Sequence, residues 1–305
     1  MRITYVGLGN MGAPMARHIL AAGHDLTLND LRQDGVQSLI ESGARFVGDL
    51  GAAVASAEVV LLSLPGPPEV QRVCLGGGSL LSSMARGSLL VDLTTNSPTV
   101  VREIHASFAE KGIGVVDAPV SGGVMGAQAG NLQLMVGGDE SDVARVRDVL
   151  KTFSEDIAYL GPIGSGCVAK LVHNLIAASA AIAVYEGFSL GMKAGLKAEA
   201  LLSVLRGGAL GRHFHRFGAL ERNLQGKFDI GDFRFDLAQK DVALAMDLAR
   251  AIRVPMDLSA LTEQMMLEGL QRGWAARDAV AVPFLIQEQR AGVTMRFGNE
   301  DSPGS

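Results

Sequence analysis

The hydrophobic pattern changes along the chain. Up to about residue 160, short apolar runs alternate with stretches in which apolar positions recur every three or four residues. Short apolar runs bounded by turn residues predict buried strands, whereas the three-four spacing predicts helices. Beyond residue 160 only the helical spacing continues. The sequence therefore predicts an α/β domain followed by an all-α domain.

The predicted strands are separated by segments with helical spacing. We expect strands at residues 2–6, 25–29, 58–64, 88–93, 114–117, 132–137 and 156–160. Strands that alternate with helices are typical of a parallel, doubly wound sheet that carries helices on both faces. In this prediction the last two strands complete that same sheet.

One helical segment is much longer than the others and organises the rest of the chain. It runs from Gly164 to about Gly195, is rich in alanine, leucine, isoleucine and valine, and contains no proline. At about 1.5 Å per residue it extends roughly 45 Å, which is longer than a small domain is wide. We therefore expect a first domain at 1–162, this helix as a connection at 163–195, a helical second domain at 196–291, and a disordered tail at 292–305. Within the second domain, helical spacing covers residues 197–205, 213–224, 238–252, 258–270 and 278–289.

Composition and charge narrow the class of protein. A charged fraction of 19% and a hydrophobic fraction of 48% are typical of a soluble globular enzyme or binding protein. A net charge of −5 without a long basic run argues against nucleic acid as the main partner. Two cysteines, Cys74 and Cys167, are too few for a disulfide framework or a four-ligand zinc site. The cytoplasm, which is reducing, is the natural compartment.

No targeting or membrane segment is expected. Glycines at positions 7, 9 and 12 interrupt the apolar run that a signal peptide would need. The uncharged part of the long helix, between Asn174 and Glu186, is too short to cross a bilayer.

The first predicted strand leads into a glycine-rich turn and then into a helix. The turn is Gly7-Leu8-Gly9-Asn10-Met11-Gly12, and helical spacing follows to Ala22. In Rossmann-type dinucleotide-binding folds, the first glycine allows a tight turn, the second lets the pyrophosphate approach the backbone, and the third lets helix and strand pack closely. The phosphates then meet unpaired N–H groups at the helix N-terminus. These six residues are candidate cofactor-binding residues.

Asp30 follows the second predicted strand, 23 positions after Gly7. This spacing is close to that of the acidic residue that binds the adenosine ribose hydroxyls in such folds. Because a carboxylate repels a 2′-phosphate, Asp30 favours NAD over NADP. Arg32 leaves NADP open as the alternative, since a guanidinium at this place could bind the 2′-phosphate.

Further candidate residues stand where other predicted strands end, which is the edge at which parallel sheets bind ligands. Leu64 and Pro65 end one strand, and Thr95 and Asn96 follow another. We assign Leu64, Pro65 and Thr95 to the cofactor, and for Asn96 a cofactor contact is equally open. Ser97 is expected to cap the helix that follows it.

The stretch from Ser121 to Gly130 is rich in glycine and follows the strand at 114–117. Glycines and a serine at such close spacing predict a loop whose backbone N–H groups converge on an anion, such as a substrate carboxylate. A simple turn is the alternative interpretation of the same residues. We take Ser121, Gly122 and Gly123 as candidate substrate-binding residues.

Lys170 and Asn174 carry polar groups on the apolar start of the long helix. They are four residues apart and share a helix face. A lone buried ammonium is expensive, so Lys170 either extends to the surface or serves a site. Oxidation of an alcohol needs a group that takes the hydroxyl proton while hydride leaves carbon, and a desolvated lysine can do this.

Four segments together resemble the β-hydroxyacid dehydrogenases, the family that includes 3-hydroxyisobutyrate dehydrogenase and tartronate semialdehyde reductase. They are GLGNMGAPMA at 7–16, DAPVSGG at 117–123, GSGCVAK at 164–170 and QKDVALAMD at 239–247, and they span nearly the whole chain. The resemblance implies a fold like that of 6-phosphogluconate dehydrogenase. It also implies an oxidoreductase that transfers hydride between NAD, or NADP, and a small β-hydroxyacid.

The same resemblance implies roles for individual residues. Lys170 corresponds to the catalytic acid/base, and Asn174 corresponds to the residue that orients the substrate. Thr95 lies beside the cofactor and the substrate, and Lys240 is expected to reach both from the second domain. The substrate carboxylate is held by Ser121, Gly122 and Gly123. No metal site is implied.

The chain departs from the family pattern at three places, the last of which is expected to tune substrate choice. The family usually has two adjacent amides where this chain has His173-Asn174, and often a glutamine where it has Cys167. The segment Arg212-His213-Phe214-His215-Arg216 is richer in histidine than its counterpart, and it lies either on a solvated surface or at the substrate entrance. Phe233 and Phe235 either wall the pocket or belong to the core.

Two other functions stay open alongside the dehydrogenase. An NADPH-linked reductase of an aldehyde or imine would share the architecture, although imine reductases generally lack the lysine found here at Lys170. A nucleotide-binding protein without activity is the third possibility, against which the intact Lys170 and Asn174 argue. The apolar face expected on so long a helix predicts pairing with further copies, as a homodimer or homotetramer.

Overall fold

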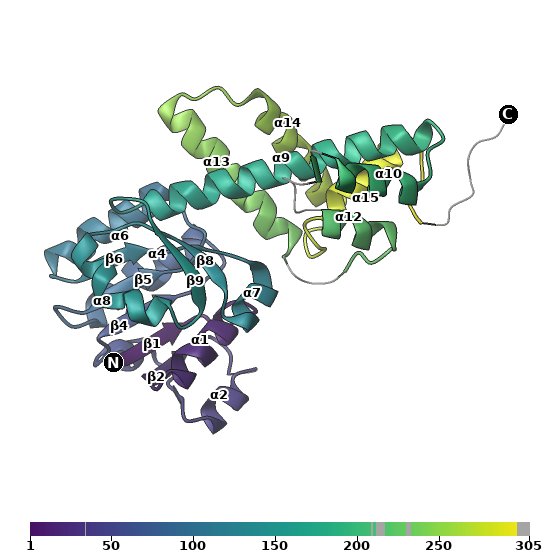
Figure 1. Ribbon diagram of the computed structural model, residues 1–305. Coiled ribbons are helices and arrows are strands. Elements are labelled where there is room, and N and C mark those ends of the chain that lie inside the picture. The colour runs from purple at the N-terminus through teal and green to yellow at the C-terminus, as the bar shows by residue number, and fades with distance from the viewer. Residues whose placement is uncertain (34, 209, 212–216, 230–232, 298–305) are drawn as a thin grey trace. The chain divides into compact units, whose positions relative to one another are not determined.

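The computed structural model describes residues 1–33, 35–208, 210–211, 217–229 and 233–297 (Figure 1). The chain forms two compact units, Met1–Val172 and the residues from His173 onward. The division falls inside the predicted long helix, α9 (Ser165–Lys193), rather than at its start. The predicted change from α/β to all-α is confirmed, because every strand among the described residues ends before residue 160.

The first unit contains a six-stranded sheet in the order β3-β2-β1-β4-β5-β6. Its strands are β1 (Arg2–Val6), β2 (Asp25–Asn29), β3 (Arg45–Phe46), β4 (Val59–Leu62), β5 (Leu89–Asp92) and β6 (Gly114–Asp117). All neighbouring strands are parallel. In this order the winding direction switches between β1 and β4, and sheets of this kind bind ligands at the carboxyl ends of the strands beside such a switch.

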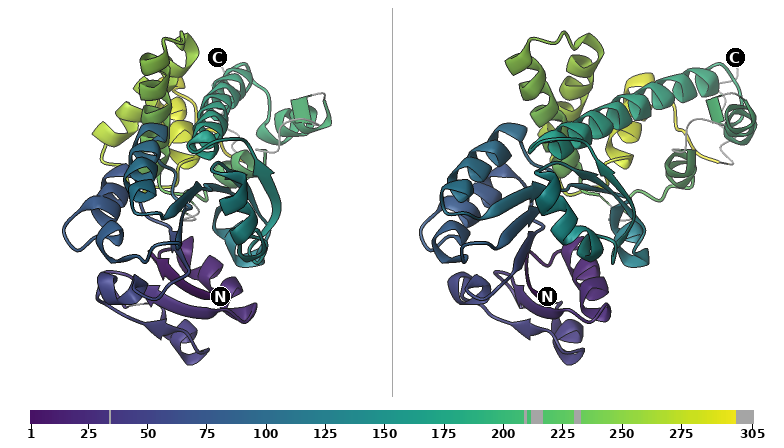
Figure 2. Two further views of the ribbon diagram at one scale, coloured as in Figure 1. Left: turned by 90° about the vertical axis from the view of Figure 1, so that its left-hand side faces the viewer. Right: turned by 60° about the vertical axis from the view of Figure 1, so that its left-hand side comes forward.

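Side chains from the two faces of this sheet build two separate cores. Tyr5 and Leu61 belong to one core, which they share with α1 (Gly12–Ala21), α2 (Gln37–Glu41) and α8 (Glu140–Leu150). Val60 and Leu62 belong to the other, which they share with α3 (Leu50–Val54), α4 (Pro67–Leu75), α5 (Leu80–Ser83) and α6 (Pro98–Glu110). Figures 1 and 2 show helices on both sides of the sheet. Burial on both faces explains why these strands are continuous apolar runs in the sequence.

A second sheet has three strands in the order β7 (Val120–Ser121), β8 (Leu132–Val136) and β9 (Ser154–Tyr159). β7 is antiparallel to β8, and β9 is parallel to it. The prediction that the strands near 132–137 and 156–160 complete the main sheet is therefore wrong. β6 meets this second sheet only in an isolated antiparallel bridge between Asp117 and Gly137. Pro119 follows closely, and its missing N–H prevents a longer ladder.

Helices are the main secondary structure of the second unit, whose described residues also contain an isolated antiparallel bridge between Arg234 and Asp278. Besides most of α9 it contains α10 (Ala198–Gly207), α12 (Phe217–Leu224), α13 (Phe235–Ile252), α14 (Asp257–Gln271) and α15 (Ala281–Ala291). Tyr185 and Phe188 of α9 are buried in its core. The ring of Phe284 from α15 meets Tyr185 edge-on, with 5.5 Å between the ring centroids.

The segment after α15 differs from the expected disordered tail. Met295 is fully buried in the core of the second unit, and the N–H of Phe297 donates to the carbonyl of Leu224. Val293 and Phe297 also pack against this core, so three apolar residues hold a segment whose composition is otherwise polar. Residues 298–305 lie outside the described part of the chain.

Among the described residues, α9 is the one helix long and apolar enough to cross a membrane by its length and composition. The core helix of a globular protein passes the same test. Cys167 and Leu171 of α9 are buried in the first unit, and Tyr185 and Phe188 are buried in the second. Packing within the chain explains only part of its apolar character, because 33% of its most apolar stretch is buried.

Candidate active site

The glycine turn lies at the carboxyl end of β1, at the switch point of the sheet. Gly7 has a φ of 92°, and a Cβ on it would lie 2.3 Å from the carbonyl oxygen of Ser63. A Cβ on Gly12 would lie 2.0 Å from the carbonyl oxygen of Gly7, so only glycine lets α1 start this close to the turn. At Gly9, in contrast, a Cβ would meet no atom within 4 Å. The space beside Gly9 is open, as the approach of a pyrophosphate requires.

The start of α1 fits a phosphate for a second reason. The helix begins at Gly12, and no side chain caps the N–H groups of its first turn. Uncapped N–H groups and the positive end of the helix dipole favour an anion at this place. The residues of the turn therefore fit the pyrophosphate of a dinucleotide.

Asp30 holds the glycine turn from the end of β2. Its Oδ2 accepts a hydrogen bond from the N–H of Leu8 at 2.7 Å, and its Oδ1 accepts one from the N–H of Arg32 at 3.0 Å. This arrangement brings the Asp30 carboxylate to the edge of the crevice, where the sequence places the adenosine ribose. The side chain of Arg32 is exposed. The Asp30 carboxylate and Arg32, which bear on the choice between NAD and NADP, therefore lie at the same edge of the sheet.

The loops after β4 and β5 are bonded to each other. The N–H of Leu64 donates to Oγ1 of Thr94 at 3.1 Å, and the N–H of Thr94 donates to Oδ1 of Asp92 at 3.0 Å. Because both loops follow parallel strands, Leu64, Pro65 and Thr95 lie at the same edge of the sheet as the glycine turn. Their assignment to the cofactor stays a prediction.

Asn96 and Ser97 do not have the roles that the sequence suggests. The side chain of Asn96 is fully buried, where its Nδ2 donates to Asp92 Oδ2 at 2.8 Å and its Oδ1 accepts from the N–H of Ser97 at 2.7 Å. Both ends of the amide are used inside the loop, so it is not the cofactor contact that was an open alternative. Ser97 stands at the N-cap position of α6, but its side chain makes no capping hydrogen bond.

Two buried carboxylates lie side by side below these loops. Asp92 and Asp117 are the last residues of β5 and β6 and are paired in register. Burial raises the pKa of Asp92 to about 6, while hydrogen bonds from Asn96 and Thr94 act in the opposite direction. Burial also raises the pKa of Asp117, against hydrogen bonds from Gly164 and Cys167. Sequence reasoning missed both residues as parts of the site, because an aspartate at the end of an apolar run only marks where a strand ends.

The glycine-rich stretch after Ser121 is not the open loop that the sequence predicts, because residues Gly123–Ala129 form a short helix, α7. At its start, Gly122 and Gly123 have φ values of 134° and 65°, a backbone that favours glycine. A Cβ on Gly122 would also lie 2.9 Å from the side chain of Leu132. Backbone N–H groups in such a turn form a concave anion site. The expected carboxylate-binding role of Ser121, Gly122 and Gly123 stays a prediction with this geometry behind it.

Lys170 is buried in the second turn of α9, where its residue is only 8% exposed. The start of this helix is bound to the carboxylate of Asp117. Oδ1 of Asp117 accepts a hydrogen bond from the N–H of Gly164, and Oδ2 accepts one from the N–H of Cys167, each at 2.7 Å. Lys170 follows Cys167 by three residues, so it lies near the carboxyl end of β6, on the edge of the sheet that carries the glycine turn. Burial also excludes a surface lysine as the explanation of this residue.

In the second unit, Asn174 takes part in a chain of polar contacts. Its Nδ2 donates to Asp241 Oδ2 at 2.6 Å, and its Oδ1 lies 2.9 Å from Nδ1 of His173. Oδ1 of the buried Asp241 lies 3.1 Å from Nζ of Lys240. This last contact is an ion pair by distance only, because Oδ1 has no partner with hydrogen-bond geometry among the described residues. The amide of Asn174 is thus fixed at both ends, while the roles of Asn174 and Lys240 toward substrate stay predictions.

The remaining candidates of the second unit divide into core and surface. Phe235 is fully buried, and a Cβ on Gly269 would lie 2.6 Å from its ring, so core packing explains it. Phe233 is 39% exposed, which leaves it able to line a site. The segment Arg212–Arg216 lies outside the described residues.

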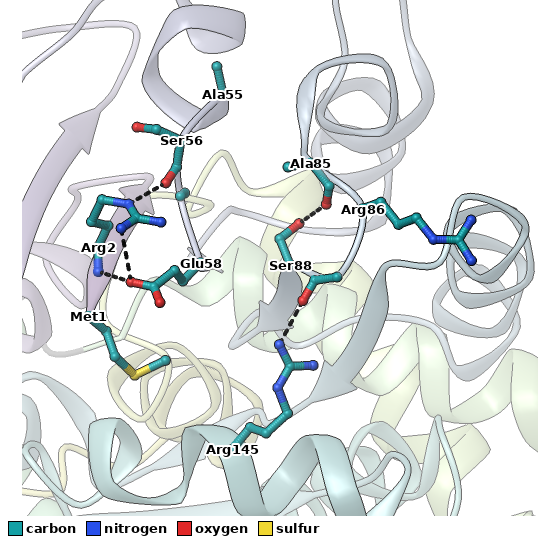
Figure 3. A pocket seen from close by; sticks show the side chains of 11 residues that line it. Met1, Arg2, Ala55, Ser56, Glu58, Ala85, Arg86, Ser88 and Arg145 are labelled. Atoms are coloured by element: carbon teal, nitrogen blue, oxygen red, sulfur yellow. Dashed lines mark hydrogen bonds and ion pairs between the residues drawn. The ribbon is translucent and has the colours of Figure 1, made fainter.

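A pocket of about 570 Å³ lies at the opposite edge of the main sheet and does not belong to this site (Figure 3). Two of its arginines are bonded to protein atoms. Arg2 pairs with Glu58 and donates to Ser56, and Arg145 donates to the carbonyl of Gly87. Figure 3 shows Arg86 extending away from Arg2 and Arg145. The pocket therefore offers no group of converging cations to a phosphate.

No cluster of three or more histidine, cysteine, aspartate or glutamate side chains suited to a metal ion occurs in the described ranges.

Known proteins match nearly the whole chain. Residues 2–161 match the NAD binding domain of 6-phosphogluconate dehydrogenase, and residues 164–285 match the NAD-binding domain of NADP-dependent 3-hydroxyisobutyrate dehydrogenase. The chain is 33% identical to 2-(hydroxymethyl)glutarate dehydrogenase of Eubacterium barkeri, over 98% of both chains. It is 37% identical to NAD-dependent L-serine dehydrogenase of Pseudomonas aeruginosa, over 93% of this chain and 97% of the relative.

Solved structures give the same result for the fold. The 3-hydroxyisobutyrate dehydrogenase of Mycobacterium tuberculosis with L-serine aligns with a TM-score of 0.83 at 33% identity. The alignment covers 93% of this chain and 98% of that one.

Proposed function

The chain belongs to the β-hydroxyacid dehydrogenase family, and from this premise we propose that it transfers hydride between a nicotinamide dinucleotide and a small β-hydroxyacid, with Lys170 as general acid/base. Its relatives are named as dehydrogenases of 3-hydroxyisobutyrate, L-serine and 2-(hydroxymethyl)glutarate. The chain is accordingly an NAD(P)-dependent oxidoreductase that acts on a CH–OH group.

The observation that carries the role of Lys170 is its burial at the start of α9, a turn that Asp117 fixes to the end of β6. Ser121 follows Asp117 by four residues, so the lysine and the anion-binding turn start from the same anchor. Burial of an amine favours its neutral form, which is the form that accepts a proton. Ser121, Gly122 and Gly123 hold the substrate carboxylate, and Lys170 takes the hydroxyl proton during oxidation and returns it during reduction. The bound nicotinamide supplies the hydride chemistry.

The panel experiment that tests this proposal compares the wild-type enzyme with Lys170→Met. NADH formation is followed with 3-hydroxyisobutyrate, 3-hydroxypropionate, serine and larger 3-hydroxyacids, and NADH binding is measured by fluorescence. We expect the variant to lose turnover by about a hundredfold to ten-thousandfold, which is what a positioned acid/base contributes, while NADH binding is kept. Lys151→Met is the matched control, because Lys151 is exposed and pairs with Asp148. The proposal would be contradicted by wild-type turnover in Lys170→Met, or by a wild-type enzyme that oxidises none of the hydroxyacids in the panel.

NAD is the proposed physiological cofactor, because Asp30 presents a carboxylate at the adenosine end of the crevice. Asp30→Ala should lower kcat/KM with NADH and raise the relative efficiency with NADPH, since the repulsion of the 2′-phosphate is removed. The same kcat/KM ratio in variant and wild type would contradict this assignment.

A homodimer or homotetramer in the cytoplasm is the proposed state of the protein. In the second unit, Ile176, Leu258 and Leu261 are each more than 60% exposed, and so large an exposed apolar surface is typical of an interface. Light scattering of Leu258→Lys and Leu261→Lys should show smaller particles than wild type. Identical masses would exclude this face as the contact.

A further inference from the structure

We propose that Asp117 is a positioning residue, whose buried carboxylate fixes the first turn of α9 and thereby sets where Lys170 lies relative to the anion-binding turn at 121–123. The inference rests on the proposed function, because Lys170 is the group being positioned. Asp117 itself contacts neither substrate nor cofactor in this account.

The Asp117 carboxylate caps the N-terminus of α9, although Asp117 is distant from this helix in the sequence. The first N–H groups of a helix have no partner inside it and are usually bonded by the side chain of the residue just before the helix. At the start of α9, two of these groups are bonded instead by a strand residue that lies 47 and 50 positions earlier. Each carboxylate oxygen takes one N–H at 2.7 Å. Two short bonds to one charged group fix direction as well as distance.

The carboxylate cannot move away from this contact, because the backbone of Asp117 is fixed. Its N–H donates to the carbonyl of Gly137 at 3.0 Å, and its carbonyl accepts from the N–H of Gly137 at 2.8 Å. A Cβ on Gly137 would lie 2.5 Å from Asp117 Oδ1. The residue is fully buried, so no water competes for its oxygens.

The first turn of α9 also packs tightly against the sheets. A Cβ on Gly166 would lie 2.1 Å from the carbonyl oxygen of Met135 and 2.9 Å from that of Asp117. The backbone at Gly166 therefore lies directly on the ends of β6 and β8. Together with the two hydrogen bonds, this contact determines both the depth and the rotation of the first turn.

Lys170 depends on that first turn. It follows Cys167, the residue bonded to Asp117 Oδ2, by three positions, so a rotation or shift of the first turn is carried directly to the lysine. A displacement of about 1 Å at a reacting group can cost on the order of a hundredfold in rate. The strand that ends at Asp117 also leads into Ser121. The carboxylate of Asp117 thus anchors the helix that carries the acid/base, and its backbone leads into the turn that holds the substrate.

The test uses Asp117→Asn in the full-length protein, because the amide has the same size but offers only one acceptor oxygen. We expect hydrogen exchange of the amides at residues 164–168 to become at least tenfold faster. We also expect kcat to fall about tenfold to a hundredfold, while the Kd for NADH stays within twofold. Asp117→Ala, which removes both acceptors, should accelerate this exchange further than Asp117→Asn.

Asp49→Asn is the matched control. Asp49 Oδ1 caps α3 by accepting from the N–H of Ala52 at 2.7 Å, and it lies outside the residues placed in the site. This variant should leave kcat, NADH binding and the exchange at 164–168 unchanged.

Three results would overturn the inference. The first is wild-type kcat and wild-type exchange at 164–168 in Asp117→Asn. The second is loss of NADH binding together with kcat, which would make Asp117 a folding residue only. The third needs no variant: in the wild-type protein, the amides of Gly164 and Cys167 exchange as fast as unprotected ones. Failure of the proposed function is recognised separately, by turnover in Lys170→Met, and leaves the exchange results unaffected.

Discussion

Gly9→Ala separates cofactor binding from folding, because the three glycines of the turn have different surroundings. At Gly12 a Cβ would lie 2.0 Å from a carbonyl oxygen, so the start of α1 would have to move by more than 1 Å. Overpacking of this kind costs about 1–3 kcal/mol of unfolding free energy. At Gly9 a Cβ meets no atom within 4 Å, and the φ is not among the positive values. The free energy of unfolding of Gly9→Ala should therefore stay equal or rise by up to about 1 kcal/mol.

For NADH binding we expect the larger effect at Gly9, although for stability it is expected at Gly12. Because the open space at Gly9 is the one that a pyrophosphate approaches, the added methyl should weaken NADH binding at least about tenfold, or ~1.4 kcal/mol. Urea unfolding gives the stabilities of Gly9→Ala and Gly12→Ala, and fluorescence titration gives the Kd for NADH. Gly77→Ala is the control, since a Cβ there also meets no atom within 4 Å and lies away from the turn. Wild-type NADH binding by Gly9→Ala would refute the placement of the pyrophosphate, and wild-type stability of Gly12→Ala would refute the packing argument.

Three further predictions concern the residues around the lysine and the amide. Gly166→Ala should lose about 1–3 kcal/mol of unfolding free energy in urea, because its Cβ would lie 2.1 Å from a carbonyl oxygen; unchanged stability would contradict the seating of α9. The pKa of Asp92 is about 6 in the folded protein against 3.8 ordinarily, so the folded state keeps a proton that the unfolded chain releases. Stability should therefore fall as pH rises from about 4 to 6, by on the order of 3 kcal/mol from this residue, and Asp92→Asn should flatten the curve of unfolding free energy against pH in that window. Asp241→Asn replaces the charged partner of Asn174 and should raise KM for the hydroxyacid severalfold without changing the Kd for NADH; equal KM values would contradict the role of this contact.

Sequence predicts the parts of this protein whose signal is local. The glycine turn, the buried strands of the main sheet and the long helix each have a periodicity or a residue pattern of their own, and the structure has them where they were expected. The two-residue β3 is too short to leave such a pattern. The strands β8 and β9 are recognisable as strands, but their separate sheet depends on pairing with β7 and is not visible in either segment alone.

The residues of the site also differ in how well the local sequence indicates them. Lys170 stands out because an ammonium on an apolar helix needs an explanation. Asp117 does not stand out, because its partners lie 47 and 50 positions away and nothing in the local sequence connects them. Asn96 and Ser97 are both good capping residues, and only the buried contact with Asp92 shows why the amide turns inward. Contacts between distant segments are thus the part that periodicity and spacing leave undetermined.

The most direct test of the central claim is to follow deuterium from the substrate to the cofactor. A β-hydroxyacid that turns over is supplied with deuterium on its carbinol carbon, and the NADH formed is examined by NMR. If Lys170 is the acid/base, the wild-type enzyme forms NADH with deuterium at C4 of the nicotinamide, and Lys170→Met forms no labelled NADH under the same conditions. NADH without deuterium, or label transferred by Lys170→Met at the wild-type rate, would contradict this expectation.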